Sequence, residues 1–168
     1  EVLGTQGGVT AGSVEKLEAC RHLGADILIN YREENFADVL KNRCDRILDI
    51  IGAKYLDQNV TALAQDGHMV IIGMQGGVKG ELNIGKLLAK RGTISATALR
   101  ARSHADKARI VTDTIKHMWP LLADGTITHQ LHATLPLADA ARAHELLRSG
   151  AVTGTLVLNV CSNEASKG

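Results

Sequence analysis

Three residues whose side chains can bind phosphate lie near the start of the chain. Ser13 and Lys16 follow a short β-rich run that ends at Gly12, and Tyr31 follows the next one. A hydroxyl, a cation three residues later and the exposed amides of a helix start all favour a phosphate. An acidic residue at this strand end would instead bind ribose hydroxyls and repel a 2′-phosphate. The alternative is structural, with Ser13 as a helix cap, Lys16 solvated and Tyr31 on the surface.

The elements that must position these groups alternate between strand and helix up to about residue 97. The pattern predicts strands at 8–11, 27–29, 46–52, 68–72 and 93–97, and helices at 14–23, 35–42, 55–64 and 84–89. Continuous apolar strands joined by helices predict a parallel sheet covered on both faces. Gly12, Gly52 and Gly73 end three of the strands, where open α/β sheets bind ligands and where glycine permits close approach.

The regular alternation of strands and helices ends after about residue 100. A long helix is predicted at 105–122, with Ile110, Ile115, Met118 and Leu122 facing inward, and a strand, a helix and a strand follow at 131–135, 137–148 and 155–160. The domain organisation expected from this pattern has four parts. They are an N-terminal segment of uncertain role (1–8), a nucleotide-binding domain without its first strand (9–125), a strand-helix-strand unit (126–160) and a flexible tail (161–168).

Several segments together resemble the zinc-independent, NADPH-dependent quinone oxidoreductases of the medium-chain dehydrogenase/reductase superfamily. The resemblance covers about residues 9–160, and its segments are 10–16, 23–26, 29–34, 49–52, 67–73, 99–103 and 143–158. It implies an α/β fold with a partial Rossmann-type, doubly wound parallel sheet, whose C-terminal strands would return to an absent N-terminal domain. It also implies NADPH as cofactor and a quinone or an enone as the acceptor of hydride.

The resemblance assigns the cofactor-binding residues but no catalytic side chain and no metal ligand. Leu99, Arg100 and Arg102 would lie on the loop that covers the nicotinamide half. The full set of cofactor contacts expected is Gly12, Ser13, Lys16, Tyr31, Ile51, Gly52, Gly73, Leu99, Arg100 and Arg102.

The chain departs from the resembled family in two places. Its sequence starts at roughly the second Rossmann strand, so we expect the C-terminal half of a reductase, and the glycine-rich residues 4–8 are not expected to form a pyrophosphate turn. Gly154-Thr155 stands where the family commonly has Gly-Lys, so no cationic contact is expected there. Two alternatives stay open: a truncated, non-catalytic nucleotide-binding or dimerisation module, and a relative of enoyl or zinc-type alcohol reductases.

Composition narrows the function classes. The 168 residues are 45% hydrophobic, 22% charged and only 2% aromatic, with a net charge of +1. This composition excludes disorder and argues against nucleic-acid or membrane binding. His129, His132 and Cys44 lack further ligands at zinc-like spacing, so no metal site is expected. An odd number of cysteines, three, fits free thiols and a cytoplasmic location.

The last predicted strand of the sheet suggests self-association. Its β-branched, uncharged character is typical of a sheet edge, and such edges tend to pair. In the resembled family this strand meets its twin across a two-fold axis, so the resemblance implies a homodimer. The absent central strand would leave a gap to be closed by residues 1–8, by another chain or by rearrangement. The expected contact residues are Thr93, Ile94, Ser95, Ala96 and Thr97.

Overall fold

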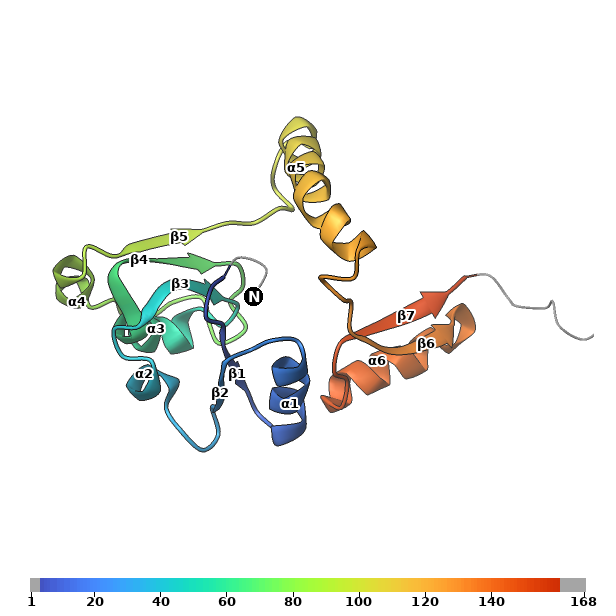
Figure 1. The fold of residues 1–168 in the computed structure, drawn as a ribbon, viewed down its shortest axis with the longest axis horizontal. Coiled ribbons are helices and arrows are strands. Elements are labelled where there is room, and N and C mark those ends of the chain that lie inside the picture. Colours follow the sequence, from blue (N-terminus) through green and yellow to red (C-terminus); the bar gives the residue numbers. More distant parts are fainter. Residues whose placement is uncertain (1–3, 161–168) are drawn as a thin grey trace, which may run out of the picture.

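The computed structural model of the chain describes residues 4–160, so the predicted tail at 161–168 and the start of the 1–8 segment lie outside the described residues. Strands and helices alternate along most of the chain (Figure 1). Their bounds are β1 Gly8–Ala11, α1 Val14–His22, β2 Ile27–Asn30, α2 Phe36–Val39, β3 Cys44–Asp49, α3 Leu56–Ala62, β4 Leu63–Ile71, α4 Ile84–Ala89, β5 Thr93–Ala96, α5 His104–Ala123, β6 Leu131–Pro136, α6 Ala140–Ser149 and β7 Thr155–Asn159.

Every strand pairing is parallel, which confirms the predicted α/β class. Within residues 4–160 the strands form three small sheets rather than one, in the orders β1-β2, β3-β4-β5 and β6-β7. Within the described part of the chain no strand pairs with both β1 and β3, so the gap between them is not closed by backbone pairing. β5 pairs with β4 alone and therefore lies at a sheet edge, as its composition predicts.

Apolar side chains from β2, α2 and α3 hold the first two sheets together. The core cluster consists of Ile29, Phe36, Ala37, Leu40 and Ala62. The Phe36 ring packs on the ring of Tyr55, with 5.1 Å between ring centroids, although α2 spans only four residues and not the predicted 35–42. The aromatic contact supplies core volume in a chain with few aromatic residues.

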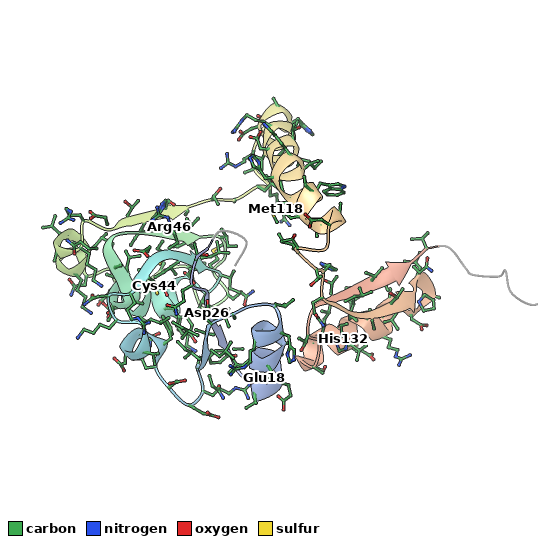
Figure 2. The ribbon with its side chains drawn as sticks, viewed as in Figure 1. Glu18, Asp26, Cys44, Arg46, Met118 and His132 are labelled. Atoms are coloured by element: carbon green, nitrogen blue, oxygen red, sulfur yellow. The ribbon has the colours of Figure 1, made fainter. Side chains whose placement is uncertain are left out.

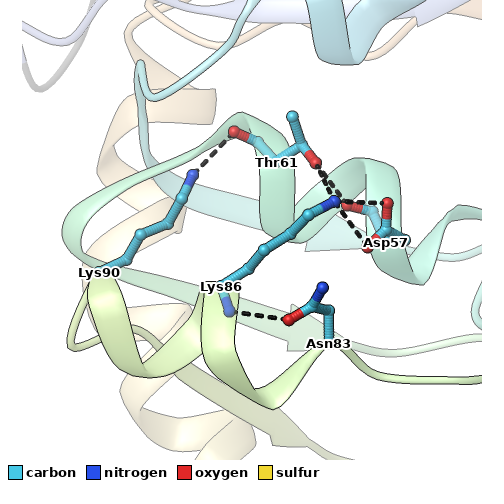
Figure 3. Close-up of polar contacts among 5 residues, drawn as sticks. All are labelled: Asp57, Thr61, Asn83, Lys86 and Lys90. Atoms are coloured by element: carbon cyan, nitrogen blue, oxygen red, sulfur yellow. Dashed lines mark hydrogen bonds and ion pairs between the residues drawn. The ribbon is translucent and has the colours of Figure 1, made fainter.

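The helix α3 ends two residues earlier than its apolar pattern predicts, and β4 begins at once with Leu63. Lys90, which follows α4, explains this end, and Lys86 of α4 contacts the start of α3 (Figure 3). The Lys90 ammonium donates to the carbonyls of Thr61 and Leu63 at 2.8 and 2.5 Å, and Lys86 pairs with Asp57 at 2.9 Å. Cations bonded to the last carbonyls stabilise a helix C-terminus. Both lysines therefore have structural contacts with α3.

The prediction that α5 faces inward is wrong. Ile115, Met118 and Leu122 are 44%, 38% and 42% exposed, and α5 has no buried residue. Figures 1 and 2 show why: α5 stands apart from the strands, and Met118 lies far from Cys44 at the core. An apolar stripe at helical spacing identifies a helix face, but a neighbouring element must be present to bury it. Among the described residues, no helix is both long and apolar enough to span a bilayer.

Candidate phosphate-binding site

The turn from β1 into α1 is set by a hydroxyl cap. Ser13 has an extended backbone (φ −153°), and its Oγ accepts the Lys16 backbone N–H at 3.4 Å, as the structural interpretation of this residue predicts. Capping ends the strand and leaves the first amides of α1 at the carboxyl edge of the sheet. The cap does not use the hydroxyl proton, which is donated to the Glu15 carboxylate instead.

A pocket of about 440 Å³ opens at this strand end. It brings together Ser13, Lys16 and Tyr31, the three residues that the sequence singled out. Two cationic side chains line it, and none of its lining residues carries a carboxylate. Such a lining fits an anion. The complete lining is Thr10, Ala11, Gly12, Ser13, Lys16, Tyr31, Arg32 and Gly150.

Gly12 is required by the close approach of Tyr31. A Cβ built on Gly12 would lie 2.5 Å from the Tyr31 hydroxyl oxygen and 3.2 Å from Nε of Arg32. The absent side chain therefore lets the phenol and the guanidinium reach over the strand end. Tyr31 arrives there because β2 runs parallel to β1, with Ala11 beside Asn30 and the Tyr31 N–H bonded to the Ala11 carbonyl.

Lys16 is held by a residue 134 positions away. Its Nζ donates to the carbonyl oxygen of Gly150 at 2.9 Å. Gly150 follows α6 in the left-handed conformation (φ 74°), and its N–H bonds to the Leu147 carbonyl. This contact places the turn after α6 against the pocket, and Figure 1 shows that end of α6 beside α1.

A carboxylate lies next to the pocket although it does not line it. The backbone N–H of Glu15 and the Ser13 hydroxyl bond to the Glu15 carboxylate and hold its pKa below the usual range. Glu15 is therefore ionised at neutral pH and occupies part of the positive end of α1. An incoming phosphate would compete with this carboxylate for the Ser13 hydroxyl.

The structure does not bring Ile51, Gly52 and Gly73 into this pocket. The buried Asp49 carboxylate accepts the N–H groups of Ile51 and Gly52 at 2.8 and 2.9 Å. A Cβ on Gly52 would meet the Gly77 carbonyl at 2.9 Å, and one on Gly73 would meet the Ile50 carbonyl at 2.7 Å. At both glycines the absence of a side chain lets two loops pack backbone to backbone.

The residues predicted at the nicotinamide end also lie outside the pocket. Arg102 bonds to the Asp106 carboxylate at 2.7 Å and to the Thr97 hydroxyl at 2.9 Å, which ties β5 to the start of α5. The Arg100 carbonyl accepts from Lys107, and Leu99 is half exposed. The guanidinium of Arg102 is thus engaged in a structural ion pair.

The histidines and cysteines that invite a metal interpretation do not converge. Cys44 belongs to the core region, and His132 lies on β6 in the separate C-terminal unit (Figure 2). Within residues 4–160, no three His, Cys, Asp or Glu side chains form a group that could hold a metal ion.

Four lining residues, Thr10, Ala11, Arg32 and Gly150, are absent from the expected contacts, and Arg32 and Gly150 are the two of them that lie outside the segment 10–16. Arg32 directly follows Tyr31, so the predicted position of Tyr31 at the end of β2 is a signal that could have identified it. Gly150 has no such signal, because its place in the pocket depends on a long-range tertiary contact.

The sequence matches a known protein family and several curated proteins. Residues 23–158 match the family described as zinc-binding dehydrogenase. The chain is 28% identical to quinone oxidoreductase 1 of Escherichia coli over 156 residues, which cover 89% of this chain and 47% of that protein. The chain therefore spans about half the length of the curated relatives that it matches.

Two solved structures show the same fold. The E. coli quinone oxidoreductase complexed with NADPH superposes with a TM-score of 0.74 at 28% identity, over 93% of this chain and 50% of that one. An NAD-dependent alcohol dehydrogenase gives a TM-score of 0.78 at 26% identity, over 95% of this chain and 45% of that one. The family match extends over most of the sequence, so this chain belongs to the zinc-binding dehydrogenase family.

Proposed function

We propose that this chain is the NADPH-binding portion of an oxidoreductase that transfers hydride from NADPH to a quinone or an enone. The observation that carries the proposal is the pocket at the end of β1, where Ser13, Lys16 and Tyr31 meet without a lining carboxylate. The relatives support the proposal, since the E. coli quinone oxidoreductase structure is described as complexed with NADPH.

The pocket fits the 2′-phosphate that distinguishes NADPH from NADH. A phosphate monoester is close to a dianion at neutral pH, and Lys16 offers an ammonium donor to it. Tyr31 and Ser13 offer hydroxyl protons, and Gly12 lets the backbone approach the ligand. The ribose of NADH has only hydroxyls, for which an acidic partner is preferred, and none lines the pocket.

The bound dinucleotide would supply the hydride, while the protein would orient it and exclude water. Ile51, Gly52 and Gly73 stay proposed as contacts at the next strand ends, as do Leu99, Arg100 and Arg102 toward the nicotinamide half. The proposal assigns no zinc, as the resemblance to the zinc-independent reductases implies.

Calorimetric titration with NADPH and NADH tests the proposal. We expect tighter binding of NADPH, and we expect Lys16→Met to remove most of this preference while NADH affinity changes little. Lys116→Met on α5 is a matched control, because it removes an exposed lysine outside the pocket. Equal affinity of the unmodified chain for the two dinucleotides would overturn the proposal.

Turnover is a separate expectation. The matched relatives are about twice as long as this chain. We therefore expect these 168 residues to bind NADPH without steady reduction of a naphthoquinone. Steady NADPH oxidation above a buffer control would contradict this and would also exclude the alternative of a non-catalytic module.

We further propose a homodimer through β5, over Thr93, Ile94, Ser95, Ala96 and Thr97. The Thr97 N–H bonds to the Ile71 carbonyl, so the Ala96 N–H points to the open edge. Ala96→Pro removes that donor without breaking the ladder to β4. Sedimentation equilibrium should show a dimer for the unmodified chain and a monomer for Ala96→Pro; a monomer in both cases would refute the contact.

A further inference from the structure

Lys16 and Gly150 connect two parts of the chain that are distant in sequence. Gly150 closes α6 in a left-handed turn whose N–H is already bonded to the Leu147 carbonyl, so the turn is fixed on one side. Its carbonyl receives the Lys16 ammonium at 2.9 Å at the border of the pocket. An ammonium has three N–H donors, and the Gly150 carbonyl uses one of them.

Arg32 contributes a second cation to the same pocket. Its backbone N–H bonds at 3.1 Å to Oδ1 of Asn30, a buried residue at the end of β2. Its Nε lies near the backbone of Gly12, at 3.2 Å from where a Cβ would stand. Among the ion pairs within residues 4–160, none includes Arg32. A guanidinium that lines a pocket without a protein carboxylate is suited to an external anion.

We propose that Arg32 and Gly150 complete the phosphate subsite, Arg32 as a phosphate-contacting cation and Gly150 as a positioning residue for Lys16. The inference rests on the proposed function and takes the same ligand class, a nucleoside 2′-phosphomonoester. The turn after α6 thereby becomes part of the specificity site, although it belongs to a different unit from β1 and β2.

The proposal rests on the match between the N–H donors of Arg32 and Lys16 and the negative charge of a phosphate. A guanidinium can donate two parallel hydrogen bonds to one phosphate, and an ammonium fixed at one N–H can direct the others. A fixed ammonium loses less rotamer entropy on binding than a free lysine side chain does. A ligand with its phosphate at the 5′ position gains little from this arrangement, so the loss of either residue should reduce selectivity and not general affinity.

The first test removes the Arg32 charge. Titration with adenosine 2′-phosphate should show a 10- to 100-fold loss of affinity in Arg32→Gln, the usual range for a charge-assisted hydrogen bond. Affinity for adenosine 5′-phosphate should stay within about threefold. Arg46→Gln is the control, since Arg46 is an exposed arginine of β3 outside the pocket (Figure 2). Equal affinities for the 2′-phosphate in Arg32→Gln and the unmodified chain would overturn the role of Arg32.

The second test distorts the Gly150 turn. Gly150 and Gly125 both follow a helix with positive φ, 74° and 78°, and neither has a neighbour where a Cβ would stand. Valine is strained at such a φ, so Gly150→Val and Gly125→Val should lose similar stability. Only Gly150→Val should lose selectivity for adenosine 2′-phosphate over the 5′ isomer, by about fivefold to tenfold. Equal selectivity in the two variants would overturn the positioning role.

A third measurement stays valid if Gly150→Val does not fold. The carbonyl ¹³C shift of Gly150, read by NMR through the Ala151 amide, should move in Lys16→Met and stay unchanged in Lys116→Met. An unchanged shift in Lys16→Met would refute the hydrogen bond. If the unmodified chain binds no adenosine 2′-phosphate, the proposed function fails and the inference with it. If it binds the ligand but the variants keep its selectivity, only the inference fails.

Discussion

Three strand ends that look alike in sequence are packed in two different ways. After β1, Gly12 leaves room for Tyr31 and Arg32 to reach over the strand, and a pocket remains. After β3 and β4, Gly52 and Gly73 are occupied by the backbone of the neighbouring loop. Glycine at the carboxyl end of a parallel strand therefore does not by itself predict an open pocket. The path of the following loop decides whether the space stays open.

The two regions should respond in opposite ways to the addition of one methyl group. At the end of β1 the methyl would meet the outer end of the Tyr31 side chain, and at the end of β4 it would meet the backbone of Ile50. A side chain can rotate away at small cost, whereas packed backbone must shift as a unit. The first change should affect ligand binding and the second should affect folding.

The largest effect is expected for Gly73→Ala. Its Cβ would lie 2.7 Å from the Ile50 carbonyl oxygen, so the free energy of unfolding should fall by about 3 kcal/mol, as for overpacking in a core. Urea denaturation measures this. The control is Gly85→Ala on α4, where the nearest atom is 3.4 Å away and alanine favours the helix. An equally stable Gly73→Ala would show that the loops have room to open.

Gly12→Ala should retain stability but lose ligand affinity. The new methyl displaces the Tyr31 hydroxyl, so we expect affinity for adenosine 2′-phosphate to fall about tenfold, or about 1.4 kcal/mol. In a double-mutant cycle with Tyr31→Ala, the second substitution should make the methyl at Gly12 harmless. Additive losses in the double variant would mean that Gly12 acts without Tyr31.

Glu15→Gln should strengthen binding by a smaller amount. The pKa of Glu15 is lowered by its own backbone N–H and by the Ser13 hydroxyl, so it is charged at pH 7 and repels a phosphate. A charge that is exposed to water repels a nearby phosphate only weakly, so we expect no more than about a threefold gain in affinity. The gain should shrink at high salt, and weaker binding in low salt would contradict the prediction.

The smallest effect concerns the end of β5, where Arg102 is engaged by Asp106. Hydrogen bonds from Arg102 and Arg109 hold the pKa of Asp106 below its ordinary 3.8. A carboxylate with a lowered native pKa stabilises the fold fully above 3.8, and the stabilisation is lost as pH falls through the native value. The melting temperature should therefore decrease more steeply below pH 4 in the unmodified chain than in Asp106→Asn. Parallel melting curves would show that the ion pair contributes nothing.

Some features of the protein are determined by its sequence alone. The alternation of strands and helices up to residue 97 and the Ser13 cap are local, since each depends on residues within one or two turns. The gathering of Ser13, Lys16 and Tyr31 was also predictable, because consecutive parallel strands end at the same edge. The edge position of β5 was predictable as well, from its own uncharged and β-branched residues.

Other features were decided only by the tertiary structure. Gly150 reaches the pocket through a contact across 134 residues, which no local periodicity encodes. The sequence could not separate Gly12 from Gly52 and Gly73, because an open pocket and close backbone packing both require the absence of a side chain. The apolar stripe of α5 predicted burial, yet burial depends on a neighbouring element and not on the stripe. Local chemistry thus determined which groups could bind phosphate, and long-range packing determined which of them meet.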